Sequence, residues 1–383
     1  MKVLFISSWY PTPMNPNFGV FIKEHAHAIK NAGNDVVVLA LVIQRSTDIY
    51  STELTDVLDE VGVRTLTLEI NTRYRDLVYH FVPFQSYLVK KLFYKQISSG
   101  FTPDLIHSNV IFPAGMIGDS LAKHLKKTHV ITEHWSRIKG LLEKPVLSWM
   151  AIRAYERAVR ILPVSNFLRD SMISILPSVA SLKYRIVGNV IDSDLFYYKE
   201  KKKSDNTLRF CAVATWMNKK IPDKMPELFI EALALLQKEL NQTIILTLIG
   251  GGDKLNELRQ MCTDRHLKAE LAGYQTKAEI AKYLQSADYF VHASTIETFG
   301  VVTAEALFCG TPVICSNVGA LPELVNVSNG ILCENNLESW LNGLKIALST
   351  TYKHTLIAEN IKAEFDVSSI GQKISSVYSE IAN

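Results

Sequence analysis

The sequence predicts an α/β protein with two doubly wound domains, each a parallel sheet covered by helices, that face each other across a cleft. With 383 residues, the chain is too long for one ordinary hydrophobic core. Short apolar runs alternate with helical patterns in both halves, which is typical of parallel sheets covered on both faces. Between the halves, residues 199–206 are charged and turn-rich and have no apolar period, which indicates a linker.

Apolar and branched runs in the first half predict strands, and a helical pattern follows each of them. These strands are expected at residues 3–7, 36–42, 104–108, 129–132 and 160–164. The first helix is expected at residues 18–32, because Gly33 is a stop signal directly after it.

The second half repeats this alternation. Its strands are expected at residues 210–214, 243–249, 289–292 and 313–315, and its helices at residues 226–240 and 254–266. A last helical pattern covers residues 370–381. We therefore expect one domain at residues 1–190, a linker at 191–206, a second domain at 207–365 and a C-terminal helical segment at 366–383.

Charge and cysteine content narrow the class of protein. The formal net charge is only +3 and no long basic stripe appears, which argues against a nucleic-acid partner. The odd number of cysteines and their spacing argue against a disulfide framework or a zinc site, and fit reduced thiols. The N-terminal apolar run is too short for a signal peptide, and no run reaches the roughly 18 apolar residues of a membrane span. We expect a cytoplasmic protein.

Residues 294–305 are the most informative stretch of the chain. An apolar run at 289–293 predicts a buried strand, and from Val301 the pattern becomes helical. Gly300 between them allows the backbone to approach a ligand closely. The free N–H groups and dipole of the helix start would bind an anion such as a diphosphate. Glu297 and Glu305 flank this cradle, so one carboxylate could bind ribose hydroxyls and the other a transferred sugar.

With Thr298, Phe299 and Gly300 inside it and Gly-Thr-Pro-Val-Ile after it, this stretch resembles the E-x7-E signature of retaining glycosyltransferases with the GT-B fold. The resemblance is closest to glycosyltransferase family 4 (glycosyl transferases group 1) and covers nearly the whole chain. It implies two Rossmann-like domains. The acceptor would bind mainly to residues 1–190 and the nucleotide-sugar donor mainly to residues 207–365, with the C-terminal helix packing back on the first domain.

The resemblance also assigns roles to single residues. Gly19 would open a helix beneath the donor diphosphate, and His134 would contact the donor sugar near the reaction centre. Lys219 and Lys224 would bind the diphosphate. The family usually has arginine at the first of these two positions, and a lysine supplies a point charge without a bidentate fork. Met225 replaces the family's glycine after the second cation.

Further positions follow from the same resemblance. The nucleotide base would pack near Gly250, Gly273 and Tyr274. His107, at the end of a predicted strand, is expected to shape the wall of the cleft. Asp192 and Asp194 form an Asp-x-Asp string, which binds a metal ion in other glycosyltransferases. Here we interpret it as a turn and expect no metal ion and no cofactor.

The resemblance implies a retaining transferase that moves a sugar from a UDP- or GDP-linked donor to a hydroxyl of a glycan or lipid-linked acceptor. Cell-surface polysaccharide or lipopolysaccharide biosynthesis is the expected setting. The catalytic set would be His134, Glu297, Lys219 and Lys224. Two alternatives stay open: a GT-B sugar-nucleotide epimerase, which breaks the same anomeric bond without an acceptor, and a non-catalytic sugar-nucleotide-binding protein.

Residues 73–95 combine aromatic and basic side chains. Seven aromatic residues and five lysines or arginines stand beside a single acid, Asp76. Such a composition suits peripheral contact with an anionic membrane, which would bring the protein to the inner face of the membrane. It equally suits a helix packed on the first sheet with a solvated basic edge, and the sequence does not decide between the two.

Overall fold

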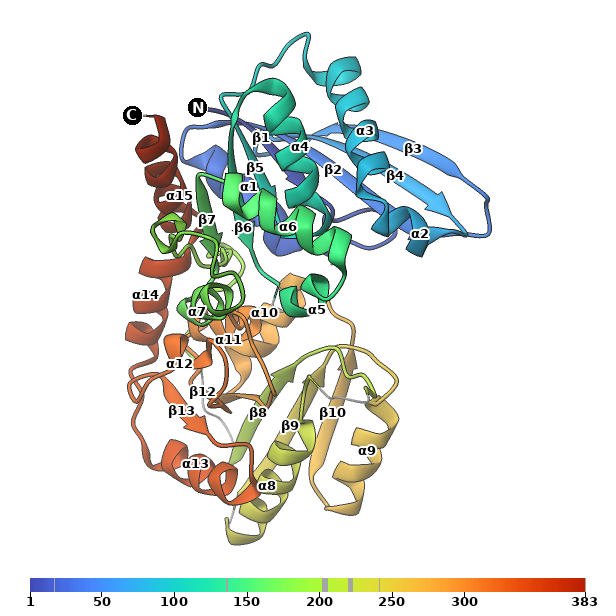
Figure 1. Cartoon of the computed structure of the whole chain (residues 1–383). Helices are drawn as coiled ribbons and strands as arrows, with labels where there is room; N and C mark the ends of the chain where they lie inside the picture. The colour runs from blue at the N-terminus through green and yellow to red at the C-terminus, as the bar shows by residue number, and fades with distance from the viewer. Residues whose placement is uncertain (17, 136, 202–205, 220–222, 241, 383) are drawn as a thin grey trace. The chain divides into compact units, whose positions relative to one another are not determined.

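The computed structural model describes the whole chain except residues 17, 136, 202–205, 220–222, 241 and 383 (Figure 1). The chain forms two compact units. Unit 1 contains Met1–Val190 together with Val367–Asn383, and unit 2 contains Ile191–Asp366. The described residues of the expected linker 191–206 group with unit 2, and residues 202–205 of it lie outside the described part of the chain.

Unit 1 is built on a seven-stranded sheet with the order β3-β4-β2-β1-β5-β6-β7. All neighbouring strands are parallel except β3, which pairs antiparallel with β4 at the edge. The central strands are buried on both faces, as their branched apolar composition requires. The strands are β1 Lys2–Ser7, β2 Asp35–Arg45, β3 Ser51–Leu58, β4 Arg64–Thr72, β5 Leu105–Asn109, β6 Thr128–Glu133 and β7 Arg160–Pro163.

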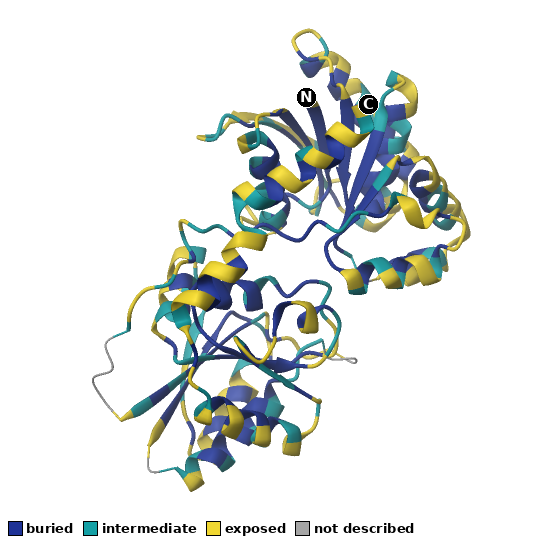
Figure 2. Cartoon of the chain, turned by 90° about the vertical axis from the view of Figure 1, so that its left-hand side faces the viewer, coloured by how far each residue is buried: buried dark blue, intermediate teal, exposed yellow. Residues whose placement is uncertain are grey.

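Helices cover this sheet and expose their outer faces, whereas the strands are largely buried (Figure 2). They are α1 Val20–Asn31, α2 Arg75–His80, α3 Val82–Leu92, α4 Met116–Leu125, α5 Ile138–Leu142, α6 Pro145–Arg157, α7 Asn166–Ile175 and α15 Val367–Ala382. Short π-helical turns occupy Phe93–Ile97 and Ile111–Gly115, and a 3-10 turn occupies Ser181–Lys183. None of the helices in the described part of the chain combines the length and apolar content that a membrane crossing requires.

Unit 2 contains a six-stranded, fully parallel sheet with the order β10-β9-β8-β11-β12-β13. Its core includes Trp340, which is fully buried and packs its ring 6.0 Å from that of Phe229. The strands are β8 Thr207–Val213, β9 Thr243–Ile249, β10 Lys268–Gly273, β11 Tyr289–His292, β12 Val313–Ser316 and β13 Gly330–Cys333. The helices are α8 Pro226–Glu239, α9 Leu255–Asp264, α10 Lys277–Ser286, α11 Val301–Phe308, α12 Leu321–Leu324, α13 Leu337–Ser349 and α14 His354–Phe365.

Two α/β units with parallel-dominated sheets confirm the predicted fold class. The predicted strands and helices are all present, with ends within about three residues of their expected positions. The antiparallel edge pair β3–β4 was not predicted. β3 exposes most of its length to solvent and is rich in polar residues, so its sequence lacks the apolar run that marks the buried strands.

The last helix, α15, belongs to unit 1, where it packs along α1. A Cβ on Gly371 would lie only 2.3 Å from the carbonyl oxygen of Ala28, so the two helices touch backbone to backbone. Tyr378 holds the other end of the helix through a hydrogen bond between its hydroxyl and Nδ1 of His107, 2.5 Å long. The chain passes from one unit to the other after Val190 and again after Asp366. The backbone N–H of Ile191 donates to the carbonyl of Phe365 at 2.9 Å, so these two connections lie next to each other.

Gly371→Ala should separate α15 from α1, because the backbone atoms of Ala28 cannot move aside alone. We expect a loss of about 1–3 kcal/mol in unfolding free energy, measured by urea denaturation followed by circular dichroism. Gly140→Ala in α5 is the matched control: a Cβ there meets nothing within 4 Å, and alanine favours the helix. Equal stability of the two variants would contradict the close packing.

Candidate functional site

The loops at the carboxyl edge of the unit 2 sheet hold most of the residues predicted to bind the donor. All six strands are parallel, so the loops that follow them emerge at one edge. The strand order reverses between β8 and β11, and ligands of open parallel sheets bind at such a switch point. The loop after β8 carries Lys219 and Lys224, and the loop after β11 carries Glu297 through Gly300.

Backbone hydrogen bonds join these two loops where they leave the sheet. Lys224 forms a β-bridge with Ser294, and the N–H of Met225 donates to the carbonyl of Ala293 at 3.0 Å. On the other side, the carbonyl of Asp223 accepts the N–H of Thr295 at 3.0 Å and the Ser294 hydroxyl at 2.8 Å. The position of Lys224 is therefore set by the exit of β11 and not by its own loop alone.

A cluster of Lys224, His292 and Glu297 lies at this junction. The ammonium of Lys224 forms an ion pair with Oε1 of Glu297. Nε2 of His292, the last residue of β11, is 2.8 Å from the same oxygen and 3.2 Å from Nζ of Lys224. Both partners contact the same carboxylate oxygen, Oε1.

The cluster keeps its carboxylate ionised. Burial alone would raise the pKa of Glu297, but the hydrogen bond from His292 and the charge of Lys224 together lower it to about 2. Burial and the neighbouring ammonium lower the pKa of His292, so its imidazole is neutral at physiological pH. A neutral ring with a proton on Nε2 donates to Glu297, which leaves Lys224 as the local cation.

Gly300 directly precedes α11, where the local sequence pattern predicts the start of a helix. It has φ 90° and ψ 55°, a left-handed conformation that favours glycine, and it is the N-cap of the helix. The free N–H groups of the first turn therefore follow directly after the loop that carries Glu297. One turn further on, Glu305 is only 4% exposed, and Nζ of Lys277 lies 3.7 Å from its Oε1. Glu305 thus already has a cationic neighbour.

The other residues of the stretch differ in exposure. Phe299 is buried, and its ring lies 5.1 Å from that of Phe365 in an edge arrangement, so its side chain belongs to the core. Thr298 and Val301 are half-buried beside the helix start.

Lys219 stands apart from this cluster. Its side chain is 44% exposed and pairs with Asp223 four residues later. It lies in the same loop as Lys224, but no contact joins it to Glu297 or His292 in the described structure. Lys224 is therefore the cation that the fold positions firmly.

Two further loops, after β9 and β10, meet the loop after β8 around the predicted base site. Gly250 directly follows β9, and its N–H donates to the carbonyl of Gly273 at 2.7 Å. A Cβ on Gly250 would lie 1.9 Å from the carbonyl oxygen of Ala214, so only glycine fits. The Tyr274 ring covers Gly251 closely and is itself 68% exposed, which leaves an open aromatic face.

In unit 1, Gly19 and His134 share one neighbourhood. Gly19 is the left-handed N-cap of α1, and a Cβ there would lie 2.4 Å from the carbonyl oxygen of Trp9. His134 follows β6 and is nearly buried, with the ring of Phe21 from α1 4.9 Å away and that of His25 5.3 Å away. Burial lowers the pKa of His134 well below its ordinary value, so its imidazole is neutral.

Glu133 fixes the backbone around His134. Its fully buried carboxylate accepts the N–H groups of His134 at 3.0 Å, Trp135 at 2.9 Å and Ile111 at 2.9 Å. The Tyr155 hydroxyl donates to it at 2.7 Å. Burial raises the pKa of this carboxyl group. One side chain therefore holds the two loops that follow β5 and β6.

The expectation that His107 shapes the cleft wall is wrong. His107 is fully buried, and its two ring nitrogens bond to Tyr378 and, at 2.6 Å, to the Thr132 hydroxyl. It lies in the core of unit 1 because its strand is central and α15 covers it. Asp192 bonds the N–H of Asp194 at 2.9 Å, as expected for a turn.

The ionisable side chains and the cysteines bear on metal-binding and thiol chemistry. No group of three or more His, Cys, Asp or Glu side chains suited to a metal ion occurs within the described ranges. The cysteines are all free and buried, and burial raises the pKa of every thiol, which makes each a weak nucleophile.

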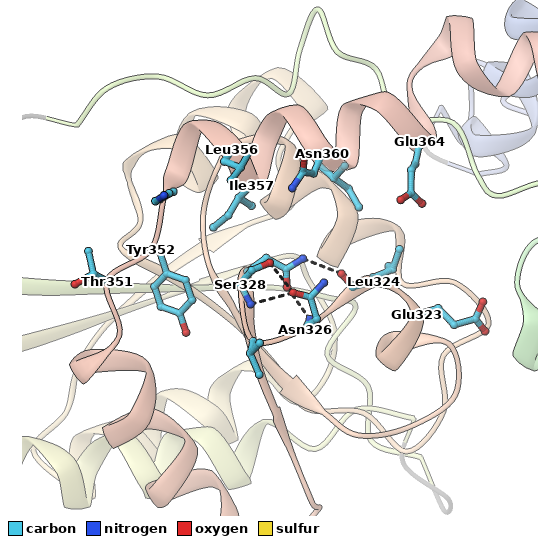
Figure 3. Close-up of a pocket in the computed structure, with 14 residues that line it drawn as sticks. Glu323, Leu324, Asn326, Ser328, Thr351, Tyr352, Leu356, Ile357, Asn360 and Glu364 are labelled. Atoms are coloured by element: carbon cyan, nitrogen blue, oxygen red, sulfur yellow. Dashed lines mark hydrogen bonds between the residues drawn. The ribbon is translucent and has the colours of Figure 1, made fainter.

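A separate cavity of about 390 Å³ lies in unit 2 between α14 and the loop before β13 (Figure 3). None of the predicted site residues lines it. Its amide side chains mostly stabilise their own turn: Asn329 donates to the carbonyl of Leu324 at 3.0 Å, and Asn326 accepts the N–H of Ser328 at 2.9 Å. These groups are therefore not free to bind a ligand.

Sequence reasoning missed His292 and Glu133. His292 looked like an ordinary residue of an apolar strand, and its position at the strand's carboxyl end was the only available signal. Glu133 directly precedes a predicted site histidine, but its role depends on loops whose contacts the sequence does not reveal.

The chain matches two family models. Residues 18–195 match the model described as Glycosyltransferase Family 4, and residues 212–363 match the one described as Glycosyl transferases group 1. The chain is 24% identical over 397 residues to the putative teichuronic acid biosynthesis glycosyltransferase TuaC of Bacillus subtilis, covering 96% of this chain and 95% of TuaC.

Two more similarities agree with these matches. An Escherichia coli UDP-Gal:alpha-D-GlcNAc-diphosphoundecaprenol alpha-1,3-galactosyltransferase is 28% identical over 210 residues, covering 52% of this chain and 54% of that protein. The crystal structure of Anabaena HepE in complex with UDP superposes with a TM-score of 0.72 at 19% identity, over 99% of this chain and 100% of HepE. The chain therefore belongs to the glycosyltransferases with the GT-B fold that the Family 4 and group 1 descriptions cover.

Proposed function

We propose that this protein is a retaining glycosyltransferase that uses a nucleotide diphospho-sugar. The cluster of Lys224, His292 and Glu297 beside the start of α11 carries this proposal. It offers a cation and free N–H groups to a diphosphate, and an ionised carboxylate to the hydroxyl groups of the attached sugar. A nucleotide-sugar donor presents both kinds of group in direct succession.

In the proposed reaction, the bond between the anomeric carbon and the donor phosphate breaks. The acceptor oxygen bonds to the same face of that carbon, and its proton passes to the leaving phosphate. The protein supplies positioning and charge stabilisation. Lys224 and the start of α11 stabilise the leaving diphosphate, with Lys219 as a second, looser cation. Glu297 orients the sugar, and Glu305 binds the ribose.

The remaining assignments complete the proposed donor site. Gly250, Gly273 and Tyr274 would contact the nucleotide base. Gly19 and His134 would serve the reaction centre from unit 1. Because lysine cations and helix N–H groups neutralise the diphosphate here, the proposal includes no metal ion.

The acceptor is proposed to be a growing glycan or a lipid-linked sugar at the inner face of the membrane. The relatives named above act, by their descriptions, in teichuronic acid biosynthesis and on a diphosphoundecaprenol-linked sugar. Cell-surface polysaccharide or lipopolysaccharide biosynthesis is the corresponding setting. UDP is favoured as the donor nucleotide because HepE is crystallised with UDP and with UDP-glucose, and GDP is the second choice.

Slow hydrolysis of the donor tests the retaining mechanism without a known acceptor. The protein is incubated with UDP-glucose, UDP-galactose, UDP-N-acetylglucosamine or GDP-mannose, and the released sugar is followed by proton NMR. We expect the first released sugar to have the donor's own α configuration, before mutarotation. A β sugar would contradict retention. An epimeric sugar would indicate the isomerase, and no turnover of any donor would favour the non-catalytic alternative.

Nucleotide binding should raise the melting temperature, because a ligand at a hundredfold excess over its Kd stabilises the folded state by about 2.7 kcal/mol. We expect a shift with one of UDP, GDP or ADP that EDTA leaves unchanged. Lys224→Ala should lose most of this shift. Lys345→Ala, which removes a lysine paired with Glu239 at 2.7 Å elsewhere in unit 2, should keep it. A shift that requires Mg²⁺ would overturn the metal-free site.

His292→Leu should separate sugar recognition from diphosphate binding, because His292 acts through Glu297. We expect donor hydrolysis to slow at least tenfold, while the thermal shift with the nucleoside diphosphate changes little. His292→Gln, whose amide can donate in place of Nε2, should recover much of the activity. Equal losses of diphosphate binding and activity, without recovery by glutamine, would show that His292 only supports the local fold.

A further inference from the structure

We infer that a groove formed by α3, α4 and α6 on unit 1 docks onto the surface of an anionic lipid bilayer. The inference extends the proposed function, since a lipid-linked acceptor would lie at such a surface. Its observations are independent of the donor site, because every residue involved lies on the outer helices of unit 1.

The groove has a volume of about 740 Å³ and is strongly basic. Lys90 comes from α3, Lys123 from α4, and Arg153 and Arg157 from α6. Asp119 is the single acid among the described residues that line it, and it already forms an ion pair with Arg157 at 2.9 Å. Three cationic side chains therefore remain without an acidic partner in the lining, which is complementary to lipid phosphates.

Aromatic side chains accompany these charges. Tyr87 is 59% exposed and Trp149 is 60% exposed, although each has a large apolar ring. The guanidinium of Arg153 lies 5.2 Å from the centre of the Trp149 ring, so a positive charge and an aromatic ring are in direct contact. Val146, one turn before Trp149 on α6, is 71% exposed. Tryptophan and tyrosine beside lysine and arginine are the side chains that favour the headgroup region of a bilayer.

The residues of the segment 73–95 divide between the two interpretations. Phe93 is buried, and Tyr79 packs its ring 5.1 Å from that of Phe112, so these aromatics support the fold. Tyr87 and Lys90 point into the groove instead. The docking surface is therefore narrower than the segment along α3 and is completed by α4 and α6, far away in the sequence.

Vesicle sedimentation tests the inference with the full chain. The protein is mixed with vesicles of phosphatidylcholine alone or with 30% phosphatidylglycerol, at low and at high salt. We expect binding only to the anionic vesicles, weakened at least tenfold by high salt. The triple variant Lys90→Gln, Lys123→Gln, Arg153→Gln should lose at least tenfold in binding, and Trp149→Ser should also weaken it.

The matched control is Lys238→Gln, Lys282→Gln, Lys362→Gln, which removes the same charge from exposed positions of unit 2. It should bind within about twofold of the unmodified protein. Equal losses in both triple variants would mean attraction by net charge alone and would overturn the docking surface, as would equal binding to neutral vesicles. If the groove binds inorganic diphosphate but the protein does not bind vesicles, the groove holds a small phosphate ligand. That outcome would also overturn the docking surface. The groove variants should keep the nucleotide-induced thermal shift. Loss of vesicle binding can therefore be distinguished from failure of the donor site.

Discussion

The nearly buried carboxylate of Glu297, which stays ionised, organises the loops at the carboxyl edge of the unit 2 sheet. Removing Glu297 from water is costly unless opposite charge and hydrogen bonds compensate. Lys224 and His292 supply both, and Lys224 can do so only because its loop is bonded to the exit of β11. The carbonyl of Glu297 also accepts the N–H of Ala320, which draws in the loop after β12. Glu297 thus connects its own loop to the loop after β8 through its side chain and to the loop after β12 through its backbone carbonyl.

Unit 1 also contains a buried carboxylate that holds loops together, but different groups compensate its burial. Glu133, at the carboxyl end of β6, is wholly buried, and its partners among the described residues are three backbone N–H groups and the Tyr155 hydroxyl. Its pKa is therefore raised, whereas that of Glu297 is lowered. Glu133 organises the backbone around it, and Glu297 is the carboxylate proposed to bind the donor sugar. Both lie where parallel strands end, which is where such sheets bind their substrates.

Most of the fold could be predicted because buried parallel strands have a clear apolar pattern. β3 escaped prediction because an exposed edge strand has no such pattern. Within the site, Gly300 and the start of α11 follow from local sequence. The contact between Lys224 and Glu297 spans 73 residues, and nothing local indicates which of the nearby lysines makes it. His107 was misplaced for the same reason, since its partner Tyr378 is 271 residues away.

The assignment of α15 to unit 1 bears on how the chain is made. Domains generally fold from the N-terminus during synthesis, as each one leaves the ribosome. Here the partner of α1 is translated only after the whole of unit 2, so the apolar side that receives Ile370 and Ile374 stays uncovered while unit 2 emerges. The nascent first domain is therefore incomplete until α15 has been translated, and a ribosome that stalls within unit 2 leaves that surface open to chaperones and proteases.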